Sequence, residues 1–151
     1  MKYTESLRIN GQGYITVIAS DEFITELNFV KAKNRPNELT TKAIKQLNEY
    51  LLGERKVFSL PLKAHGSEFQ QKVWSALSKI EFGKYLTYKD IAQTVGGSNY
   101  ARAVGMACNK NPLAIFIPCH RVLGSKKTLT GYAGGVSLKK ELLMLEKIET
   151  V

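Results

Sequence analysis

The sequence is poor in the residues that build disulfide frameworks and metal sites. Its 151 residues include only two cysteines, Cys108 and Cys119, and two histidines, His65 and His120. Two cysteines are too few for the disulfide framework of a small secreted domain. Neither a CxxC pair nor an HExxH motif is present, so the spacing gives no support for a zinc site. A reactive thiol remains an open alternative.

Long apolar runs are also missing, and a secretory leader is not expected. The longest apolar run covers residues 113–118, whereas a membrane-spanning helix needs about 20 apolar residues. The N-terminal segment MKYTESLRING has no apolar stretch after its basic residue and no small-residue cleavage pattern, which a secretory signal would have. We therefore expect a soluble, cytoplasmic protein without a membrane partner.

Acidic residues are outnumbered, mainly in the second part of the chain. There are 22 lysines and arginines against 13 aspartates and glutamates, a formal charge of +9. Residues 1–60 hold 9 basic and 7 acidic side chains, and residues 61–151 hold 13 and 6. This excess attracts polyanions such as nucleic acid, although a solvated basic surface has the same composition. With 44% hydrophobic and 23% charged residues, the chain is expected to form one compact domain or two small ones.

The first third of the chain predicts a small antiparallel sheet covered by one helix. Turn residues at Gly11-Gln12-Gly13 and Asp21-Glu22 separate runs of β-branched and aromatic residues. The expected strands are residues 3–10, 14–19 and 23–30. A helix over Thr40–Leu52 follows and stops at Gly53. Its apolar face is formed by Ala43, Leu47 and Leu51.

A change of pattern between residues 56 and 66 predicts a domain boundary. We place a sheet-and-helix domain at residues 1–60 and a mostly helical domain at residues 61–151, which makes the fold class α/β (α+β). In the second domain, Ser67 and Gln70 form a capping box that opens a helix toward Phe82-Gly83. The apolar positions of this helix are Phe69, Val73, Leu77 and Ile80.

Two short helices follow in the pattern of a helix-turn-helix. Residues 87–90 open the first, Gly96-Gly97 form the turn, and Ser98 is expected to cap the second, over residues 99–110. An ordinary helical hairpin has the same pattern. The second helix is rich in small residues, which suit either close packing between helices or entry into a groove. These are Ala101, Ala103, Gly105 and Ala107.

Cys119 and His120 directly follow the apolar segment Leu113–Ile117, which we expect to be a short buried strand or extended segment ended by Pro118. A thiolate is the reactive form of cysteine, and a neighbouring imidazole or positive charge favours it. Consecutive side chains diverge in extended backbone, so His120 would reach the thiol through a turn or a water molecule. An inert buried thiol is the alternative for Cys119, and packing explains Cys108 better than reactivity does.

The segment Ile117-Pro118-Cys119-His120-Arg121-Val122 resembles the active-site signature of the O6-alkylguanine-DNA alkyltransferases, also called methylated-DNA–protein-cysteine methyltransferases. Further matches follow in order through the second domain. They are Phe69-Gln70, Val73-Trp74, Phe82-Gly83, Thr87-Tyr88, Ala101–Gly105, Asn111-Pro112, Gly131-Tyr132 and Glu146. The first 60 residues agree with the family only in their layout.

The resemblance implies a DNA repair protein that transfers methyl or larger alkyl groups from O6 of guanine in double-stranded DNA to its own Cys119. The transfer is irreversible and occurs once per chain, and O4 of thymine is left open as a second target. A soft thiolate suits attack at saturated carbon, and no cofactor is needed. By this resemblance His120 takes the thiol proton through a bound water, Glu146 orients the imidazole, and Asn111 holds the surrounding turn. Without it, Glu146 is a surface carboxylate and Asn111 a helix C-cap.

The resemblance also implies that the damaged nucleotide is flipped out of the duplex. The helix-turn-helix enters the minor groove, Arg102 fills the gap left by the base, and Tyr88 assists rotation or proton transfer. Positions that contact the DNA backbone in relatives are matched by Gln70, Lys89 and Ser125. The base pocket would be lined by Val122, Tyr132 and Ala133.

No metal is expected, because some relatives bind zinc through cysteine and histidine of the first domain and no cysteine precedes Cys108 here. We expect a monomer on double-stranded DNA and leave cooperative binding open. Two rival functions remain. One is a helix-turn-helix regulator in which Cys119 is structural or redox-sensing, and the other is a cysteine hydrolase, for which no GxSxG motif is present.

Overall fold

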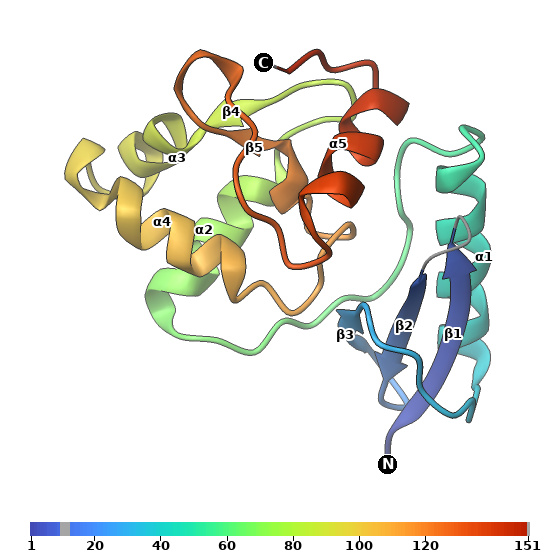
Figure 1. Cartoon of the computed structure of the whole chain (residues 1–151). Helices are drawn as coiled ribbons and strands as arrows, with labels where there is room; N and C mark the ends of the chain where they lie inside the picture. The colour runs from blue at the N-terminus through green and yellow to red at the C-terminus, as the bar shows by residue number, and fades with distance from the viewer. Residues whose placement is uncertain (10–12, 151) are drawn as a thin grey trace. The chain divides into compact units, whose positions relative to one another are not determined.

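A computed structural model describes residues 1–9 and 13–150 of the chain. The chain divides into two compact units, residues 1–65 and 66–151, drawn together in Figure 1. The first unit is a sheet with one helix and the second is mostly helical, so the expected mixed α/β fold class is confirmed. Within the described ranges, no helix combines the length and the apolar character that crossing a membrane requires.

The first unit is built on a three-stranded antiparallel sheet in the order β1-β2-β3. Its strands are β1 (Tyr3–Ile9), β2 (Gly13–Ala19) and β3 (Ile24–Asn28). The central strand β2 turns Ile15, Val17 and Ala19 into the core, where none of them is exposed, as the two-residue period of a strand requires. The expected turn at Gly11-Gln12-Gly13 lies outside the described residues except for Gly13, as does Asn10.

Helix α1 (Glu38–Leu51) lies against this sheet (Figure 1) and begins two residues earlier than expected. Asn37 is its N-cap, and Thr40 completes a capping box with it, so Thr40 stands inside the first turn and does not open the helix. Gly53 follows the end of α1 with a φ of +78°, a conformation that suits glycine. The buried face comprises Ala43, Leu47 and Tyr50, while the expected Leu51 is only half-buried.

The second unit begins with α2 (Glu68–Ser78), whose start the sequence predicts correctly. The Ser67 hydroxyl accepts from the backbone N–H of Gln70, and the Gln70 side chain accepts from the N–H of Ser67. The helix ends at Ser78, before the expected stop at Phe82-Gly83, although Ile80 is buried just beyond it. Buried Trp74 donates its indole N–H to the carbonyl of Ala107 at 2.9 Å, which ties α2 to α4.

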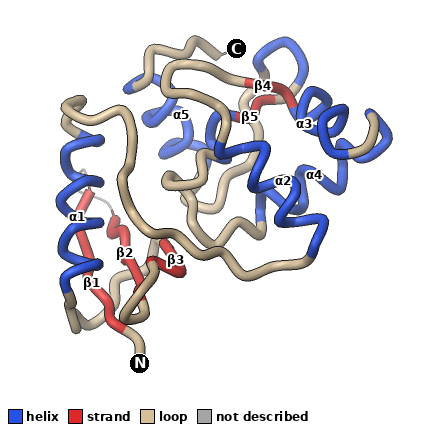
Figure 2. Tube along the Cα trace, turned by 180° about the vertical axis from the view of Figure 1, so that it is seen from behind, coloured by secondary structure: helices blue, strands red, loops and turns tan. Residues whose placement is uncertain are grey.

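Helices α3 (Tyr88–Val95) and α4 (Ala101–Asn109) are joined by Gly96-Gly97 and a 3₁₀ turn over Ser98–Tyr100. Both views place them side by side with α2 (Figures 1 and 2). The expectation that Ser98 caps the second helix is wrong, because α4 begins after the 3₁₀ turn and no side chain caps it. A Cβ at Gly96 would lie 2.8 Å from the Tyr100 ring, so a side chain at this position would have to displace that ring.

A two-residue parallel ladder joins distant parts of the second unit. It pairs β4 (Leu86–Thr87) with β5 (Val122–Leu123), so the start of α3 lies beside the segment that follows Cys119. The last helix is α5 (Val136–Leu145). Its buried residues include Leu142, Leu143 and Lys139.

The capping box of α2 gives a test of this fold. Replacing Ser67 by Ala removes the acceptor of the Gln70 N–H, and the free energy of unfolding should fall by about 1 kcal/mol. Urea unfolding followed by the fluorescence of Trp74, the single tryptophan, measures the loss. Exposed Ser75 in the middle of α2 is the matched control, and Ser75→Ala should not destabilise the protein. Equal effects of the two changes would contradict the capping role.

Candidate active site

Cys119 opens a 3₁₀ turn over Cys119–Arg121 and follows a buried turn, not a strand. The expected strand or extended segment at Leu113–Ile117 is wrong, although the segment is buried as expected. The backbone N–H of Ile117 donates to the carbonyl of Leu113 at 2.8 Å, so the segment folds back on itself. Within it, buried Ile115 has a φ of +75°, a strained conformation for a β-branched residue.

The side chain of Asn111 holds this turn from within. Its Nδ2 donates to the carbonyl of Ile117 at 2.9 Å, and its Oδ1 accepts from the N–H of Leu113 at 2.9 Å. The same Ile117 carbonyl accepts from the backbone N–H of Cys119 at 2.7 Å. Asn111 therefore fixes the strained backbone that leads into Cys119, whereas the C-cap of α4 is Lys110.

The thiol of Cys119 is nearly enclosed, since the residue is 5% exposed. Burial raises its pKa, and a hydrogen bond with the Asn111 side chain and the charge of Lys139 act in the opposite direction. Because burial is the largest effect, the thiol is protonated until a base removes its proton. Cys108, buried on α4, has its pKa raised to about 12, mainly by burial, which fits a packing role.

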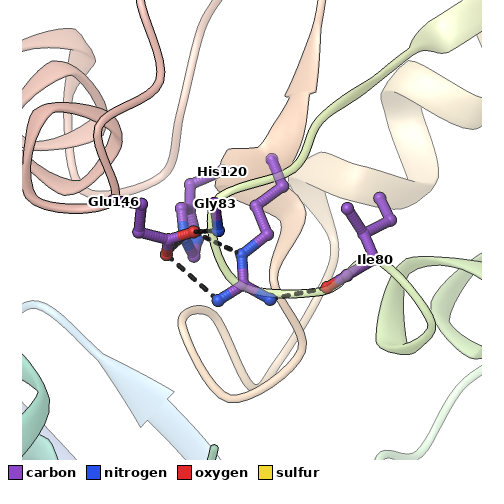
Figure 3. Close-up of polar contacts among 5 residues, drawn as sticks. Ile80, Gly83, His120 and Glu146 are labelled. Carbon is purple, nitrogen blue, oxygen red and sulfur yellow. Dashed lines mark hydrogen bonds and ion pairs between the residues drawn. The ribbon is translucent and has the colours of Figure 1, made fainter. Parts of the chain in front are cut away.

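Glu146, immediately after α5, gathers His120, Arg121 and Gly83 around one buried carboxylate (Figure 3). His120 Nε2 lies 2.7 Å from Glu146 Oε2. Arg121 donates to the carboxylate in a bidentate manner, from Nε at 2.7 Å and Nη2 at 3.1 Å, and the Gly83 N–H donates to Oε1 at 3.1 Å. The third guanidinium nitrogen of Arg121, Nη1, donates to the carbonyl of Ile80 at 2.6 Å. The surface position considered for Glu146 is wrong, because the residue is 2% exposed.

The imidazole of His120 is fully buried and neutral near pH 7. Burial lowers its pKa, and the carboxylate of Glu146 only partly opposes this effect. Because that carboxylate accepts hydrogen bonds, Nε2 carries the ring proton and Nδ1 is left with the lone pair. The ring of Tyr132 meets the imidazole edge-on, with the centroids 6.5 Å apart. The arrangement supplies a neutral base beside a protonated thiol.

Two buried basic residues escaped the sequence analysis. Arg121 lies inside the hexapeptide, but the sequence pattern assigns no role to it or to Lys139. Lys139 has no exposed surface, and its Nζ donates to the carbonyl of Val122 at 2.9 Å and to Thr130 Oγ1 at 3.0 Å. The sequence held one indication that Lys139 is buried. It follows Leu138 and stands three residues before Leu142, next to the apolar face of α5.

The remaining candidate residues differ in how far they are exposed to solvent. Lys89, Arg102 and Ser125 are exposed, and Gln70 is half-buried with its Oε1 used in the capping box of α2. Tyr88 is half-buried and its hydroxyl lies 2.7 Å from Thr130 Oγ1. Among the expected pocket residues, Val122 is buried, Tyr132 is half-buried and Ala133 is exposed. In the part of the chain that the structure describes, no three His, Cys, Asp or Glu side chains are grouped to hold a metal ion.

Burial of neutral His120 makes stability depend on pH. Its folded pKa lies below the value of about 6.5 expected when unfolded, so the unfolded chain binds the extra proton first. The free energy of unfolding should therefore fall as the pH drops below about 6.5, at up to about 1.4 kcal/mol per pH unit. Urea unfolding between pH 5 and about 8 measures this slope. His120→Gln should flatten it, whereas a change at exposed His65, His65→Gln, should leave it intact; an unchanged slope in His120→Gln would contradict the assignment.

Both units of the chain are similar to known proteins. Residues 68–148 match the family model of the 6-O-methylguanine DNA methyltransferase DNA binding domain, and residues 11–64 match that of its ribonuclease-like domain. The methylated-DNA–protein-cysteine methyltransferase of Methanosarcina acetivorans is 41% identical over 143 residues, which cover 89% of this chain and 92% of the relative. The constitutive enzyme of that name from Bacillus subtilis is 51% identical over 117 residues, covering 77% of this chain and 70% of the relative.

A solved structure shares the fold over nearly the whole chain. The crystal structure of Mycobacterium tuberculosis OGT in complex with DNA superposes with a TM-score of 0.86 at 38% sequence identity, covering 95% of this chain and 92% of that one. Both units of the chain are thus matched by family models, and its full-length relatives carry one enzyme name. The chain belongs to the methylated-DNA–protein-cysteine methyltransferase family.

Proposed function

We propose that this protein repairs double-stranded DNA by transferring an alkyl group from O6 of guanine to the sulfur of Cys119. The observation that carries the proposal is the buried His120–Glu146 pair, joined at 2.7 Å and positioned by the same 3₁₀ turn that begins at Cys119. Such a nucleophile, base and orienting carboxylate form the general arrangement for activating a weak nucleophile. An inert structural cysteine would not need this arrangement beside it.

The proton leaves Cys119 for Nδ1 of His120 through a bound water. The resulting imidazolium is stabilised by the carboxylate of Glu146, which Arg121 keeps ionised through its two hydrogen bonds. The thiolate then attacks the alkyl carbon, a carbon–sulfur bond forms, and the bond from that carbon to O6 breaks. The guanine leaves with the bonding electrons and takes up a proton. Because the product is a stable thioether and no second nucleophile is supplied, each chain acts once.

Access to the lesion requires the nucleotide to leave the base stack, at a cost of a few kcal/mol. We assign this step to α3 and α4, acting as a helix-turn-helix whose small residues suit a minor groove of about 6 Å. Arg102 is exposed on α4 and is proposed to fill the gap in the duplex. Exposed Lys89 and Ser125, together with Gln70, would contact the phosphates of the DNA backbone. Phosphate contacts do not depend on the base sequence, so this kind of binding suits lesions at any position.

The extruded base is proposed to lie against Val122, Tyr132 and Ala133. Tyr132 meets the His120 ring edge-on, so a base beside it would be close to the catalytic pair. Tyr88, at the first residue of α3, is proposed to donate a hydrogen bond to the purine as it leaves. The exposed position of Ala133 leaves room for adducts larger than methyl.

Intact-mass spectrometry tests the proposal. After incubation with a duplex that carries O6-methylguanine, each chain should gain the mass of one methyl group, and peptide mapping should place it on Cys119. Cys119→Ala should gain nothing, and Cys108→Ser, which changes the other cysteine, should react like the native protein. Release of a free product with turnover would indicate a hydrolase instead. Binding to one preferred DNA sequence without any adduct would indicate a regulator.

A further inference from the structure

Lys139 is a fully buried lysine that the proposed reaction has not yet used. It has no exposed surface, and its Nζ donates to two neutral oxygens, the carbonyl of Val122 at 2.9 Å and Thr130 Oγ1 at 3.0 Å. Within residues 1–9 and 13–150, no carboxylate forms an ion pair with it. A lysine buried in this way is costly for a fold, so a role in the adjacent site is a reasonable expectation.

The Thr130 hydroxyl connects this lysine to Tyr88. Its oxygen accepts from Lys139 Nζ and lies 2.7 Å from the hydroxyl of Tyr88. A threonine hydroxyl has one hydrogen and two lone pairs, and an amine or ammonium donor occupies one of the lone pairs. If Tyr88 donated to the other, the hydrogen of half-buried Thr130 would be left to solvent, because the described residues give it no second partner. The arrangement that pairs every hydrogen within the protein gives the Thr130 hydrogen to Tyr88 and leaves the hydrogen of Tyr88 for another acceptor.

Several titratable groups face Lys139 from the elements packed around it. Its Nζ lies 5.9 Å from the centre of the Tyr88 ring on α3. The charge of Lys139 also acts on Cys108 of α4 and on Cys119 and His120 of the 3₁₀ turn. Burial lowers the pKa of Lys139, and the two thiols act in the opposite direction when ionised. Lys139 is thus electrostatically linked to the nucleophile as well as to Tyr88.

We propose that Thr130 is a positioning residue that fixes the direction of the Tyr88 hydroxyl. It receives a hydrogen from Lys139, gives its own to Tyr88, and so leaves Tyr88 as a donor toward the purine. This inference rests on the proposed alkyl transfer. It goes beyond that function because the hydrogen bond that Tyr88 donates depends on Thr130, in the loop before α5, and on Lys139, in α5. Neither of these two residues needs to contact the DNA.

Single-turnover transfer from a duplex containing O6-methylguanine tests this network. Thr130→Val removes the hydroxyl at nearly constant volume, and the rate should fall by about fivefold to tenfold, the effect of losing one hydrogen bond. Thr130→Ser should restore the native rate. In a Tyr88→Phe background, Thr130→Val should have no further effect, because Thr130 acts only through the hydroxyl of Tyr88. Lys139→Met should also slow transfer, whereas Lys140→Met, at the exposed neighbouring position, should not.

A second readout does not depend on activity. An NMR titration of the lysine side chains should show a lower pKa for Lys139 in Thr130→Val than in the native protein, because the ammonium loses one of its two acceptors. Two outcomes would overturn this inference alone. One is that the native protein and Thr130→Val transfer the alkyl group at the same rate. The other is that Thr130→Val slows transfer as much in the Tyr88→Phe background as it does in the native protein. No transfer by the native protein would overturn the proposed function and this inference with it.

Discussion

Glu146 ends α5 inside the protein, where an ionised carboxylate is strongly destabilised unless several donors surround it. The donors to this carboxylate include His120, the Nε and Nη2 groups of Arg121 and the backbone N–H of Gly83. These donors come from the loop after α2 and from the turn at Cys119. Removing one partner of such a buried pair typically costs about 3–5 kcal/mol. The carboxylate therefore fixes the relative positions of three segments: the loop after α2, the turn at Cys119 and the end of α5. This geometry places the imidazole of His120 in the site.

Burial shifts the pKa values of Cys119 and His120 in opposite directions. It raises the pKa of the thiol and lowers the pKa of the imidazole, so the resting site holds a protonated thiol and a neutral imidazole. In the proposed reaction, proton transfer between them creates two charges. Glu146 would stabilise the imidazolium, and Asn111 and Lys139 favour the thiolate. A buried, protonated thiol resists oxidation, and it becomes a nucleophile only when a base removes its proton.

Local signals in the sequence predicted much of the fold, and they failed where distant contacts decide the structure. The capping box of Ser67 and Gln70 located the start of α2 because its hydrogen bonds join residues three positions apart. The run Leu113–Ile117 was misread because an apolar run does not distinguish a buried strand from a buried turn. Here Asn111 and the left-handed backbone of Ile115 select the turn. Composition alone left Glu146 on the surface, and only the resemblance to a family placed it in the site. Lys139 was missed because its partners, Val122 and Thr130, are distant in sequence.

The central claim is that Glu146 makes His120 the base for Cys119, and the pH dependence of the single-turnover transfer rate tests it most directly. In the native protein the rate should decline as the pH falls through the lowered pKa of His120 and reach a plateau above it. Glu146→Gln removes the charge that stabilises the imidazolium, so its plateau should be lower by about 100-fold or more, the contribution typical of a positioned base. A Glu146→Gln variant that folds normally and keeps both the native plateau and the native pH profile would contradict the account.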